Sequence, residues 1–313
     1  MGESPPGEPG WERWSRAALR RSAGGSRTVR RRALNRVLLA LPPGARRRAQ
    51  YLLAHGRLAH LRDPQRWSEK VNWRMLHDRR PLIAMTCDKQ AAAQFVLRTA
   101  VPGTVRLPRT VWSGEDPAGL ADVDWPARWV LKSNHGTGAV VPGVGTPDPA
   151  RRRDLQASAA RWLTGPGPER WGEWGYAQAR RRVVLEEALP GTGDAGIADH
   201  KFFVVGGEVR LVQVDTDRFT HHRRRFHRPD WTPLDVVCEV PLGPVGEPPA
   251  TLATMLEVAE RLGAAFDAIR VDLYEAAGEV WFGELTAYSG SGLSPFRPSG
   301  LDRELGEGWV LPR

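Results

Sequence analysis

The sequence predicts an α+β fold, because helical segments are mixed with pairs of strands that turn back on themselves. Residues 250–265 repeat apolar side chains with helical spacing. The face that they form consists of Leu252, Met255, Leu256, Ala259 and Leu262. Two strand pairs turn at Gly206-Gly207 and Ala277-Gly278, where glycine supplies the positive φ that tight turns need. The 313 residues suffice for a sizeable core shared by two or three lobes.

Helices are expected in the first hundred residues. Two of them are predicted at 28–41 and 45–60, separated by Pro42-Pro43-Gly44. A third, at 67–77, is predicted to begin at Ser68. An alanine-rich helix at 88–99 follows, and it places Lys89 in its first turn.

Strand pairs are expected in most of the remaining chain. Strands at 128–132 and 139–141 are predicted to pair through the loop Ser-Asn-His-Gly-Thr-Gly. A buried strand at 182–187 ends in two glutamates. The predicted hairpins join 202–205 to 208–215 and 269–274 to 280–285.

Composition indicates a soluble globular protein, which we expect in the cytoplasm. Apolar residues make up 41% of the chain and charged residues 26%. No apolar run approaches the roughly 20 residues that span a bilayer. Cys87 and Cys238 offer neither a disulfide framework nor a metal-ligand spacing, so both are expected to be reduced thiols.

Positive charge is concentrated near the N-terminus. Residues 1–66 hold 15 arginines and four acidic residues, a net charge of +11, whereas the whole chain carries +9. Residues 1–27 are rich in Gly, Pro, Ser and Arg and are predicted to be a disordered basic leader. Such a leader can contact an anionic membrane surface weakly. The simpler interpretation, which we favour, is a solvated arginine-rich tail, and no specific nucleic-acid partner is expected.

Lysine is scarce in this chain. Only Lys70, Lys89, Lys132 and Lys201 occur among the 45 basic residues. A coding bias that replaces lysine with arginine should leave lysine in place where a narrow site needs one compact positive charge next to a phosphate. Lys132, beside a glycine loop, fits this interpretation best. For Lys70, near the start of a predicted helix, it is equally plausible that the lysine was retained by chance and has no role at a phosphate.

The first strand pair has features of a phosphate site. Lys132 ends one strand and precedes the glycine loop, so loop amides and the lysine can close over a polyphosphate. The pattern G-x-x-x-x-G-K-[ST] is absent, which excludes a P-loop. The strand that ends in Glu186 and Glu187 can present carboxylates and backbone groups to a nucleoside. Paired glutamates at a strand end are also common as surface charges.

The last hairpin carries the most specific pattern. Asp272 and Glu284, on neighbouring strands, direct two carboxylates into one space, and Thr286 faces the same side. Such oxygens suit Mg²⁺, which keeps water and substrate phosphates as its other ligands. Arg270, on the same strand face, can meet a transferring phosphoryl group. The alternative is a ladder of charged side chains across the two strands on the protein surface. The apolar residues beside them indicate instead that the strands are buried, and a buried carboxylate needs a cation or a hydrogen-bond donor as a partner.

The order of these segments resembles the ATP-grasp fold, and more closely its TupA-like (teichuronopeptide biosynthesis) branch, over roughly residues 67–300. The matching segments are SEKVNW, DKQ, LKSNHGTG, VVLEE, DHKFFVVGGEVRLV, residues 217–231, IRVDLYEAAGEVWFGELT and SGSGLSPF. The resemblance implies two α+β lobes that clamp ATP between antiparallel sheets. It divides the chain into the leader at 1–27, a helical segment at 28–87, a first lobe at 88–190 and a second lobe at 191–313.

The resemblance also implies residue roles. The residues implied to bind ATP are Lys89, Lys132, Gly136, Gly138, Glu186, Glu187, Asp199 and Lys201. Among them, the lysines would contact phosphates, the glycines would lie in a loop above the triphosphate, the two glutamates would form the adenine hinge, and Asp199 would approach the ribose. The implied Mg²⁺ ligands are Asp272, Glu284 and Thr286. The groups implied to stabilise the γ-phosphoryl group and the acyl phosphate are Arg270, Arg218 and Lys201.

The predicted function is an ATP- and Mg²⁺-dependent carboxylate–amine ligase that forms an amide through an acyl phosphate. The resemblance suggests cell-surface polysaccharide, teichuronopeptide or capsule biosynthesis, with small-molecule or glycan carboxylates and amines as substrates. It does not assign the acceptor site, because the chain before Asp88 is expected to be helical rather than a full α/β lobe. The alternatives are a kinase on the same fold, a glycosyltransferase of the same pathway, and a non-enzymatic basic binding protein.

Residues 220–231 (THHRRRFHRPDW) form a cationic segment with three histidines and four arginines. One interpretation is a mobile arginine-rich loop. The other is a cationic rim that receives an acidic glycan or a polyphosphate-bearing acceptor. The histidines lack the i, i+4 spacing of a helical metal site.

Overall fold

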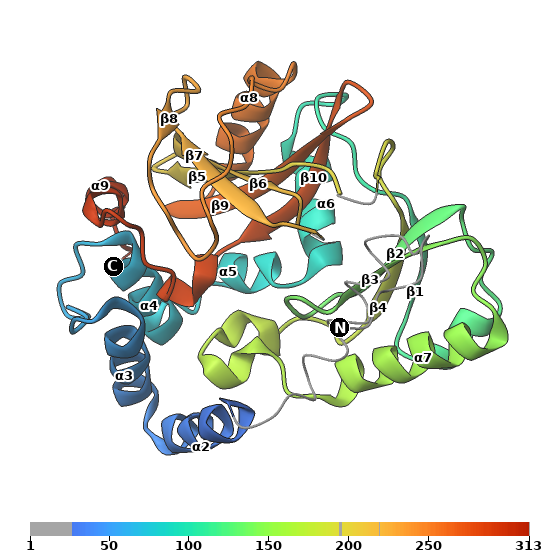
Figure 1. Cartoon of the computed structure of the whole chain (residues 1–313), viewed down its shortest axis with the longest axis horizontal. Coiled ribbons are helices and arrows are strands. Elements are labelled where there is room, and N and C mark those ends of the chain that lie inside the picture. The colour runs from blue at the N-terminus through green and yellow to red at the C-terminus, as the bar shows by residue number, and fades with distance from the viewer. Residues whose placement is uncertain (1–26, 194–195, 219, 313) are drawn as a thin grey trace, which may run out of the picture.

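The structure of the protein, a computed structural model, describes residues 27–193, 196–218 and 220–312. Within them, two antiparallel sheets stand side by side with helices around them (Figure 1), which confirms the predicted α+β architecture. The predicted disordered leader lies outside the described residues, apart from Arg27, where the first described helix begins. In the described part of the chain, no helix combines the length and the apolar character that crossing a membrane requires.

The smaller sheet has four strands in the order β1-β4-β2-β3. They are β1 Thr110–Gly114, β2 Arg128–Ser133, β3 Val140–Val144 and β4 Val183–Glu187. Helix α7, Pro149–Thr164, packs against this sheet, and Leu155 and Ala159 of the helix join Trp129 and Leu131 of β2 in one apolar cluster. Strand β2 pairs with β3 as predicted, with Lys132 opposite Val140, so Lys132 comes just before the glycine loop.

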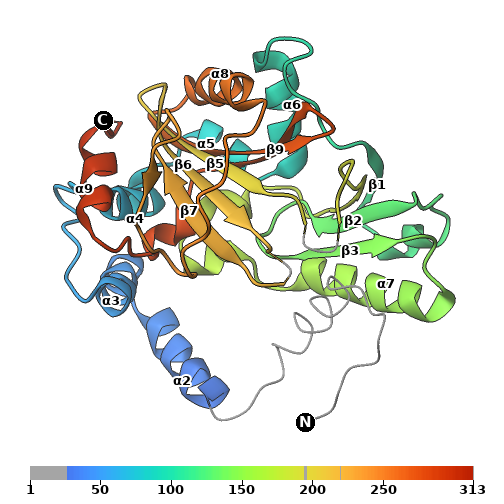
Figure 2. The same cartoon turned by 45° about the horizontal axis from the view of Figure 1, so that its top comes forward.

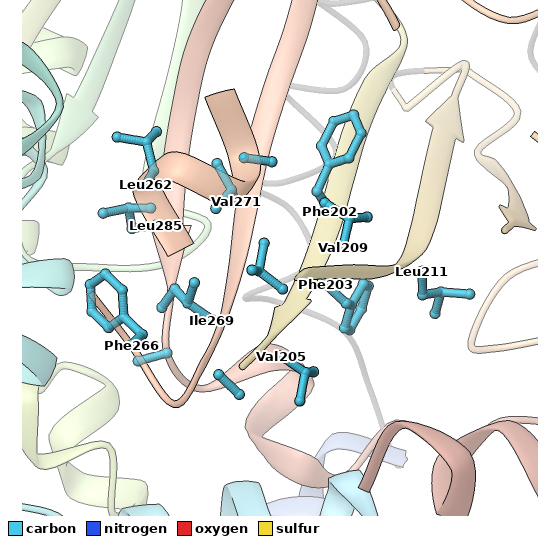
Figure 3. Packing of buried hydrophobic residues seen from close by; sticks show 14 of the residues in the cluster. Phe202, Phe203, Val205, Val209, Leu211, Leu262, Phe266, Ile269, Val271 and Leu285 are labelled. Carbon is cyan, nitrogen blue, oxygen red and sulfur yellow. The ribbon is translucent and has the colours of Figure 1, made fainter. Parts of the chain in front are cut away.

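The larger sheet has six strands in the order β10-β9-β5-β6-β7-β8. They are β5 Asp199–Val205, β6 Glu208–Thr216, β7 Arg223–His227, β8 Pro233–Leu234, β9 Ala268–Ala276 and β10 Glu279–Thr286. Helix α8, Leu252–Gly263, covers one face of this sheet (Figure 2), and Leu262 packs near Val271 and Leu285 (Figure 3). Side chains alternate between the two faces of a strand, so Phe202 is in the core while Lys201 is on the opposite face.

Both predicted hairpin turns are confirmed. The β5–β6 turn uses Gly206 and Gly207 at φ 62° and 86°, and the β9–β10 turn uses Ala277 and Gly278 at φ 52° and 73°. Positive φ at both central residues matches the right-handed twist of the flanking strands. The hairpins hold β5, β6, β9 and β10 in a fixed register, which aligns the polar residues described below.

The N-terminal part of the described chain is helical. It contains α2 Arg27–Ala40, α3 Pro43–His55, α4 Trp67–His77 and α5 Pro81–Thr86, followed by α6 Lys89–Thr99, which belongs to the predicted first lobe. Helix α4 contacts the turn η4, Ser289–Gly292, and α9, Gly300–Glu307. Lys70 on α4 donates from Nζ to the carbonyl oxygens of Gly306 at 2.8 Å and Trp309 at 2.5 Å. Lys70 therefore fastens the C-terminal end of the chain.

The predicted helix at 67–77 is confirmed as α4, but Ser68 is not the residue that opens it. Arg66 is the N-cap, and the Glu69 carboxylate accepts from the Arg66 backbone N–H at 3.2 Å. This contact satisfies a free amide of the first turn. The Ser68 hydroxyl instead donates to Asp302 Oδ2 at 2.8 Å, which ties α4 to α9.

The cationic segment 220–231 contains a strand, β7, where a mobile loop was one of the two expectations. Arg224 of β7 is buried because its guanidinium forms an ion pair with Asp215 on β6, with Nε 2.6 Å from Oδ1. Phe226, two residues further along β7, faces the same side and is buried in the core. A buried, paired arginine takes the inward position that an apolar residue usually occupies, so the run of arginines obscured the strand pattern.

Candidate active site

A cavity of about 140 Å³ lies where α6 and the two sheets meet. Its lining includes Lys89 of α6, Lys132 of β2, Glu186 of β4, and Phe282 and Glu284 of β10. Four of these five side chains are predicted site residues, and they come from segments almost 200 residues apart. The fold therefore brings the lysines of the first half of the chain to a carboxylate of the last hairpin.

Local hydrogen bonds hold Lys89 in place. Asp88 caps α6, because its Oδ1 accepts from the Ala91 amide at 2.9 Å. Asn134 of the glycine loop binds the same helix end, with its Oδ1 accepting from the Gln90 amide at 3.0 Å. Lys89 Nζ then donates to the Gly136 carbonyl at 2.6 Å. Burial lowers the pKa of Lys89, and the charge of Glu284 opposes that shift.

Lys132 and Glu186 form an ion pair across neighbouring strands. Lys132 Nζ lies 2.5 Å from Glu186 Oε2, and the side chains are only 17% and 15% exposed. Glu187 has a different position: it pairs with Arg109 at 2.9 Å, is 47% exposed and does not line the cavity. Of the two glutamates predicted to form the adenine hinge, only Glu186 faces the lysines.

The glycine loop between β2 and β3 is connected to this cavity through Lys89. Gly136 presents its carbonyl to Lys89, and Gly138 adopts φ 69° at an exposed position. No atom of the described residues lies within 4 Å of the place where a Cβ on Gly138 would be, so the requirement there is for backbone conformation, not for space. The loop has the open, small-residue character that was predicted for it.

On the larger sheet, four charged groups surround Lys201. Its Nζ donates to Asp199 Oδ2 and, at 3.2 Å, to Asp272 Oδ2. Arg218 also binds Asp199 Oδ2, at 2.5 Å. Asp215 Oδ2 lies 3.9 Å from Lys201 Nζ. Strand register explains this grouping, because Lys201 pairs with Asp272 on β9 and with Gln213 on β6, two residues before Asp215.

Arg270 binds Asp272 through two parallel hydrogen bonds. Its Nε donates to Oδ1 and its terminal nitrogen to Oδ2, both at 2.7 Å. Burial alone would raise the pKa of Asp272, but Arg270 and Lys201 outweigh burial and lower that pKa. The same guanidinium donates to the Thr286 hydroxyl at 3.1 Å and to the Ser289 hydroxyl at 3.2 Å. Thr286, a predicted metal ligand, is thus a partner of Arg270 in this structure.

The donor set fits a magnesium ion. Asp272 and Glu284 lie opposite each other on β9 and β10, and all donors there are oxygens. Asp199 Oδ1 is buried and lacks a hydrogen-bond partner in the described part of the chain, which leaves an acceptor open to a bound group. The described residues contain no cluster of three or more His, Cys, Asp or Glu side chains able to hold a metal. Two carboxylates completed by water and substrate phosphates remain the expected arrangement for Mg²⁺.

Sequence reasoning missed several polar residues beside this site. Arg224 and Lys201 lower the pKa of Asp215 to about 2 against the opposing effect of burial. Glu173, between two short helical turns, is buried close to Glu284. No periodic pattern or motif marks either residue, because each is positioned by partners far away in the sequence.

Comparison with known proteins gives one family match. Residues 166–310 match the family model described as TupA-like ATPgrasp. This region belongs to the TupA-like ATP-grasp family. The match runs from the short turns η2, Pro168–Trp171, and η3, Trp174–Ala177, to α9. It confirms the family and the fold predicted from the sequence. It includes Lys201, Arg270, Asp272 and Glu284, whereas Lys132 lies before it.

Solved structures of two ligases and a macrocyclase are similar to this chain at low identity. PsnB, an ATP-grasp ligase complexed with a phosphomimetic variant of its minimal precursor, Mg and ADP, is 13% identical, with a TM-score of 0.37 over 66% of this chain and 52% of that one. The VanG D-Ala:D-Ser ligase from Enterococcus faecalis is 15% identical, with a TM-score of 0.37 over 65% and 52%. The macrocyclase MdnC from Microcystis aeruginosa, bound to its precursor peptide MdnA, is 11% identical, with a TM-score of 0.38 over 73% and 62%. The chain thus spans about half to three-fifths of these structures, and no curated protein matches it.

Proposed function

We propose that the protein is an ATP- and Mg²⁺-dependent ligase that joins a carboxylate to an amine. The observation that carries this proposal is the convergence of Lys89, Lys132 and Glu186 with Glu284 around one cavity, beside the group formed by Lys201 and Asp272. Cations on one flank and paired carboxylates on the other suit a magnesium–nucleotide complex. Membership of residues 166–310 in an ATP-grasp family supports the same activity.

Nucleotide binding requires the present lysine contacts to change. The cavity of about 140 Å³ is smaller than the about 300–1,000 Å³ of typical ligand pockets, because lysine side chains partly fill it. Lys89 binds the Gly136 carbonyl and Lys132 binds Glu186. Phosphate oxygens would replace these partners and free Glu186 for the nucleoside. The glycine loop, exposed at Thr137 and Gly138, would then close over the triphosphate.

Charge neutralisation is the main task of the residues on the larger sheet. Asp272 and Glu284 would hold Mg²⁺, which supplies positive charge against the phosphate oxygens. Arg270, held by Asp272, and Lys201 would face the γ-phosphoryl group as the substrate carboxylate attacks it. Arg218, more exposed, would meet the acyl phosphate that forms. Displacement of phosphate from this acyl phosphate by an amine would give the amide.

We further propose that the amide belongs to a cell-surface polymer, such as a teichuronopeptide or a capsule. Only the family name supports this pathway. A carboxylate-bearing sugar or amino acid would then be the substrate that is activated.

Separate assays of ADP and free phosphate test the proposed activity. Purified protein with Mg²⁺ and ATP would be screened against free amino acids and uronic acids, alone and in pairs. A ligase releases ADP and phosphate in equal amounts, and release depends on both a carboxylate and an amine. ADP without phosphate would instead identify a kinase. Sugar transfer without ATP would identify a glycosyltransferase.

A further inference from the structure

A second and larger cleft, of about 620 Å³, lies on the other side of the glycine loop. Its walls come from α3, the glycine loop, the segment 161–171 and the turn η4. Glu173, a buried carboxylate only 6% exposed, is part of its lining. A cleft of this size lies within the range of small-molecule sites, and Gly136 is the one predicted ATP-binding residue in its lining.

The cleft adjoins the candidate nucleotide site at two places. Gly136 lines the cleft, while its carbonyl accepts from Lys89 of the first cavity. The turn η4 makes the second connection. At one end of η4, Ser289 accepts from Arg270 at 3.2 Å, and two residues later the Ser291 hydroxyl donates to Glu173 Oε1. A group bound against Glu173 would therefore be connected, through η4, to the arginine that is proposed to face the transferring phosphoryl group.

Arg47 of α3 makes this part of the cleft rigid. Its Nε donates to Asn72 at 2.7 Å, one terminal nitrogen donates to Gln50 at 3.0 Å, and the other donates to the Ser291 carbonyl. With its donors taken by the protein, Arg47 positions η4 and offers little to a ligand. Glu173 accepts a single hydrogen bond from the described residues, at Oε1, so its Oε2 remains available.

Burial makes Glu173 able to exchange a proton near neutrality. Burial raises the pKa of Glu173 to about 7, the Ser291 hydroxyl and the charge of Arg47 oppose the shift, and Glu284 adds to it. The other titratable groups around it come from α5, η3 and the start of η4. These groups are Cys87, Tyr176 and Tyr288. Burial raises the pKa of all three, so they stay neutral where Glu173 titrates.

The rim of the cleft is cationic and aromatic. Arg161 and Arg170 are exposed there, and the Arg170 guanidinium lies 5.4 Å from the centre of the Trp171 ring. Trp162 and Trp171 are half-buried and offer flat apolar surface. Exposed arginines attract an anionic group, whereas the carboxylate inside attracts an ammonium group. The two charges fit a molecule that carries an amine at one end and an anion at the other.

We propose that this cleft holds the acceptor of the ligation, an amine that also carries an anionic group, and that Glu173 takes the proton from the amine nitrogen. This inference rests on the proposed ligase function. An α-amino acid or a short acidic peptide has the required chemistry. The ammonium would bind Glu173 Oε2, and the carboxylate would lie at the arginine rim.

The proposed reaction balances. Glu173 removes one proton from the ammonium group, which leaves a neutral amine with its lone pair. The lone pair attacks the carbonyl carbon of the acyl phosphate and forms the C–N bond. The C–O bond to phosphate then breaks, and the phosphate leaves with the electron pair of that bond. The phosphate also takes the second proton lost by the attacking nitrogen. Glu173 then releases its proton to solvent.

The test compares two kinds of nucleophile, hydroxylamine and amines, in the Glu173→Gln variant. This substitution keeps the size of the side chain and its contact with Ser291. Hydroxylamine, which is largely unprotonated at neutral pH, traps the acyl phosphate as a hydroxamate without needing a base. Glycine and L-aspartate serve as anionic amines, and ethanolamine serves as an amine without an anion. We expect the ratio of amide to hydroxamate to fall at least 10²-fold in the variant. We also expect the rise of wild-type amide formation with pH, centred near 7, to disappear.

Glu169→Gln is the matched control. Glu169 lies on the neighbouring turn η2, binds the Gly167 amide and Arg181, and does not line the cleft. The amide-to-hydroxamate ratio of the Glu169→Gln variant should equal that of the wild type.

The possible failures are distinguishable. Failure of the wild type to form a hydroxamate with any carboxylate supplied would contradict the ligase function itself. Hydroxamate without any amide from the amines would overturn the proposed acceptor class. An unchanged ratio in Glu173→Gln would remove Glu173 as the base while the ligase stands. Equal use of ethanolamine and L-aspartate would overturn the role of the arginine rim.

Discussion

Replacing Lys132 by alanine is the sharpest perturbation of the candidate site. Lys132 Nζ lies 2.5 Å from Glu186 Oε2 in a partly buried ion pair at the cavity. In the proposed complex this ammonium faces the triphosphate, so its removal deletes a preorganised charge. Loss of one such donor typically costs about 10²–10³ in turnover, or about 2.7–4 kcal/mol. We therefore expect kcat for ATP consumption to fall at least about 10²-fold.

A change in folding should not account for that loss. The Lys132–Glu186 pair is partly buried, and its removal leaves Glu186 without its cation, so the melting temperature of Lys132→Ala is measured beside its turnover. The control is Arg109→Ala, which breaks the neighbouring pair with Glu187, whose side chains are 66% and 47% exposed. The assay is coupled detection of ADP from matched amounts of folded protein. Turnover in Lys132→Ala equal to that of Arg109→Ala would refute the placement of Lys132 at the phosphates.

The remaining predictions concern the metal site, stability and the leader. Glu284→Ala should lower ATP turnover by about 10²-fold and raise the Mg²⁺ concentration needed for half-activity; an unchanged magnesium dependence would exclude it as a ligand. Lys70→Ala should lower the melting temperature while activity per folded molecule persists, because Lys70 binds backbone carbonyls near the C-terminus; a stable but inactive variant would contradict this. Asp215 has a pKa of about 2 in the folded protein, below its unfolded value of about 3.9, so its stabilising contribution is complete above about pH 5 and is lost as pH falls toward about 2. The free energy of unfolding of Asp215→Asn should therefore depend less on pH in that window than that of the wild type. Equal pH dependence in the two proteins would be inconsistent with the pairing of Asp215 to Arg224. Deleting residues 1–26 should leave turnover intact, whereas loss of all function would favour a basic binding protein.

Several parts of the fold were predictable because their signals are local. Gly206-Gly207 allows positive φ at two successive residues, and the hairpin around it follows directly. The apolar stripe from Leu252 to Leu262 identifies α8, since its period matches one turn of helix. Asp88 has the side chain of a helix N-cap, and α6 begins directly after it.

Other elements depend on partners that lie far away in the sequence. Helix α7 has arginines in its first turns and little apolar patterning, yet Leu155 and Ala159 suffice to pack it on the smaller sheet. Strand β7 buries Arg224, which is possible only because Asp215 pairs with it. Charged residues at inward positions hide the alternation by which a strand is recognised.

The candidate site divides in the same way. Lys132, Asp272 and Glu284 belong to short motifs with readable spacing, so they could be proposed before the structure was known. Glu173 has no motif, and its properties come from burial and from Ser291, more than 100 residues away. The cleft beside it is likewise assembled from segments of α3, the glycine loop and η4, and no single segment of the sequence indicates it.

A crystal structure with Mg²⁺ and the non-hydrolysable analogue AMP-PNP would test the central claim most directly. The proposed function requires the triphosphate between Lys132 on the smaller sheet and Lys201 on the larger one, with the metal on Asp272 and Glu284. A nucleotide bound elsewhere, with the Lys132–Glu186 pair intact, would contradict it.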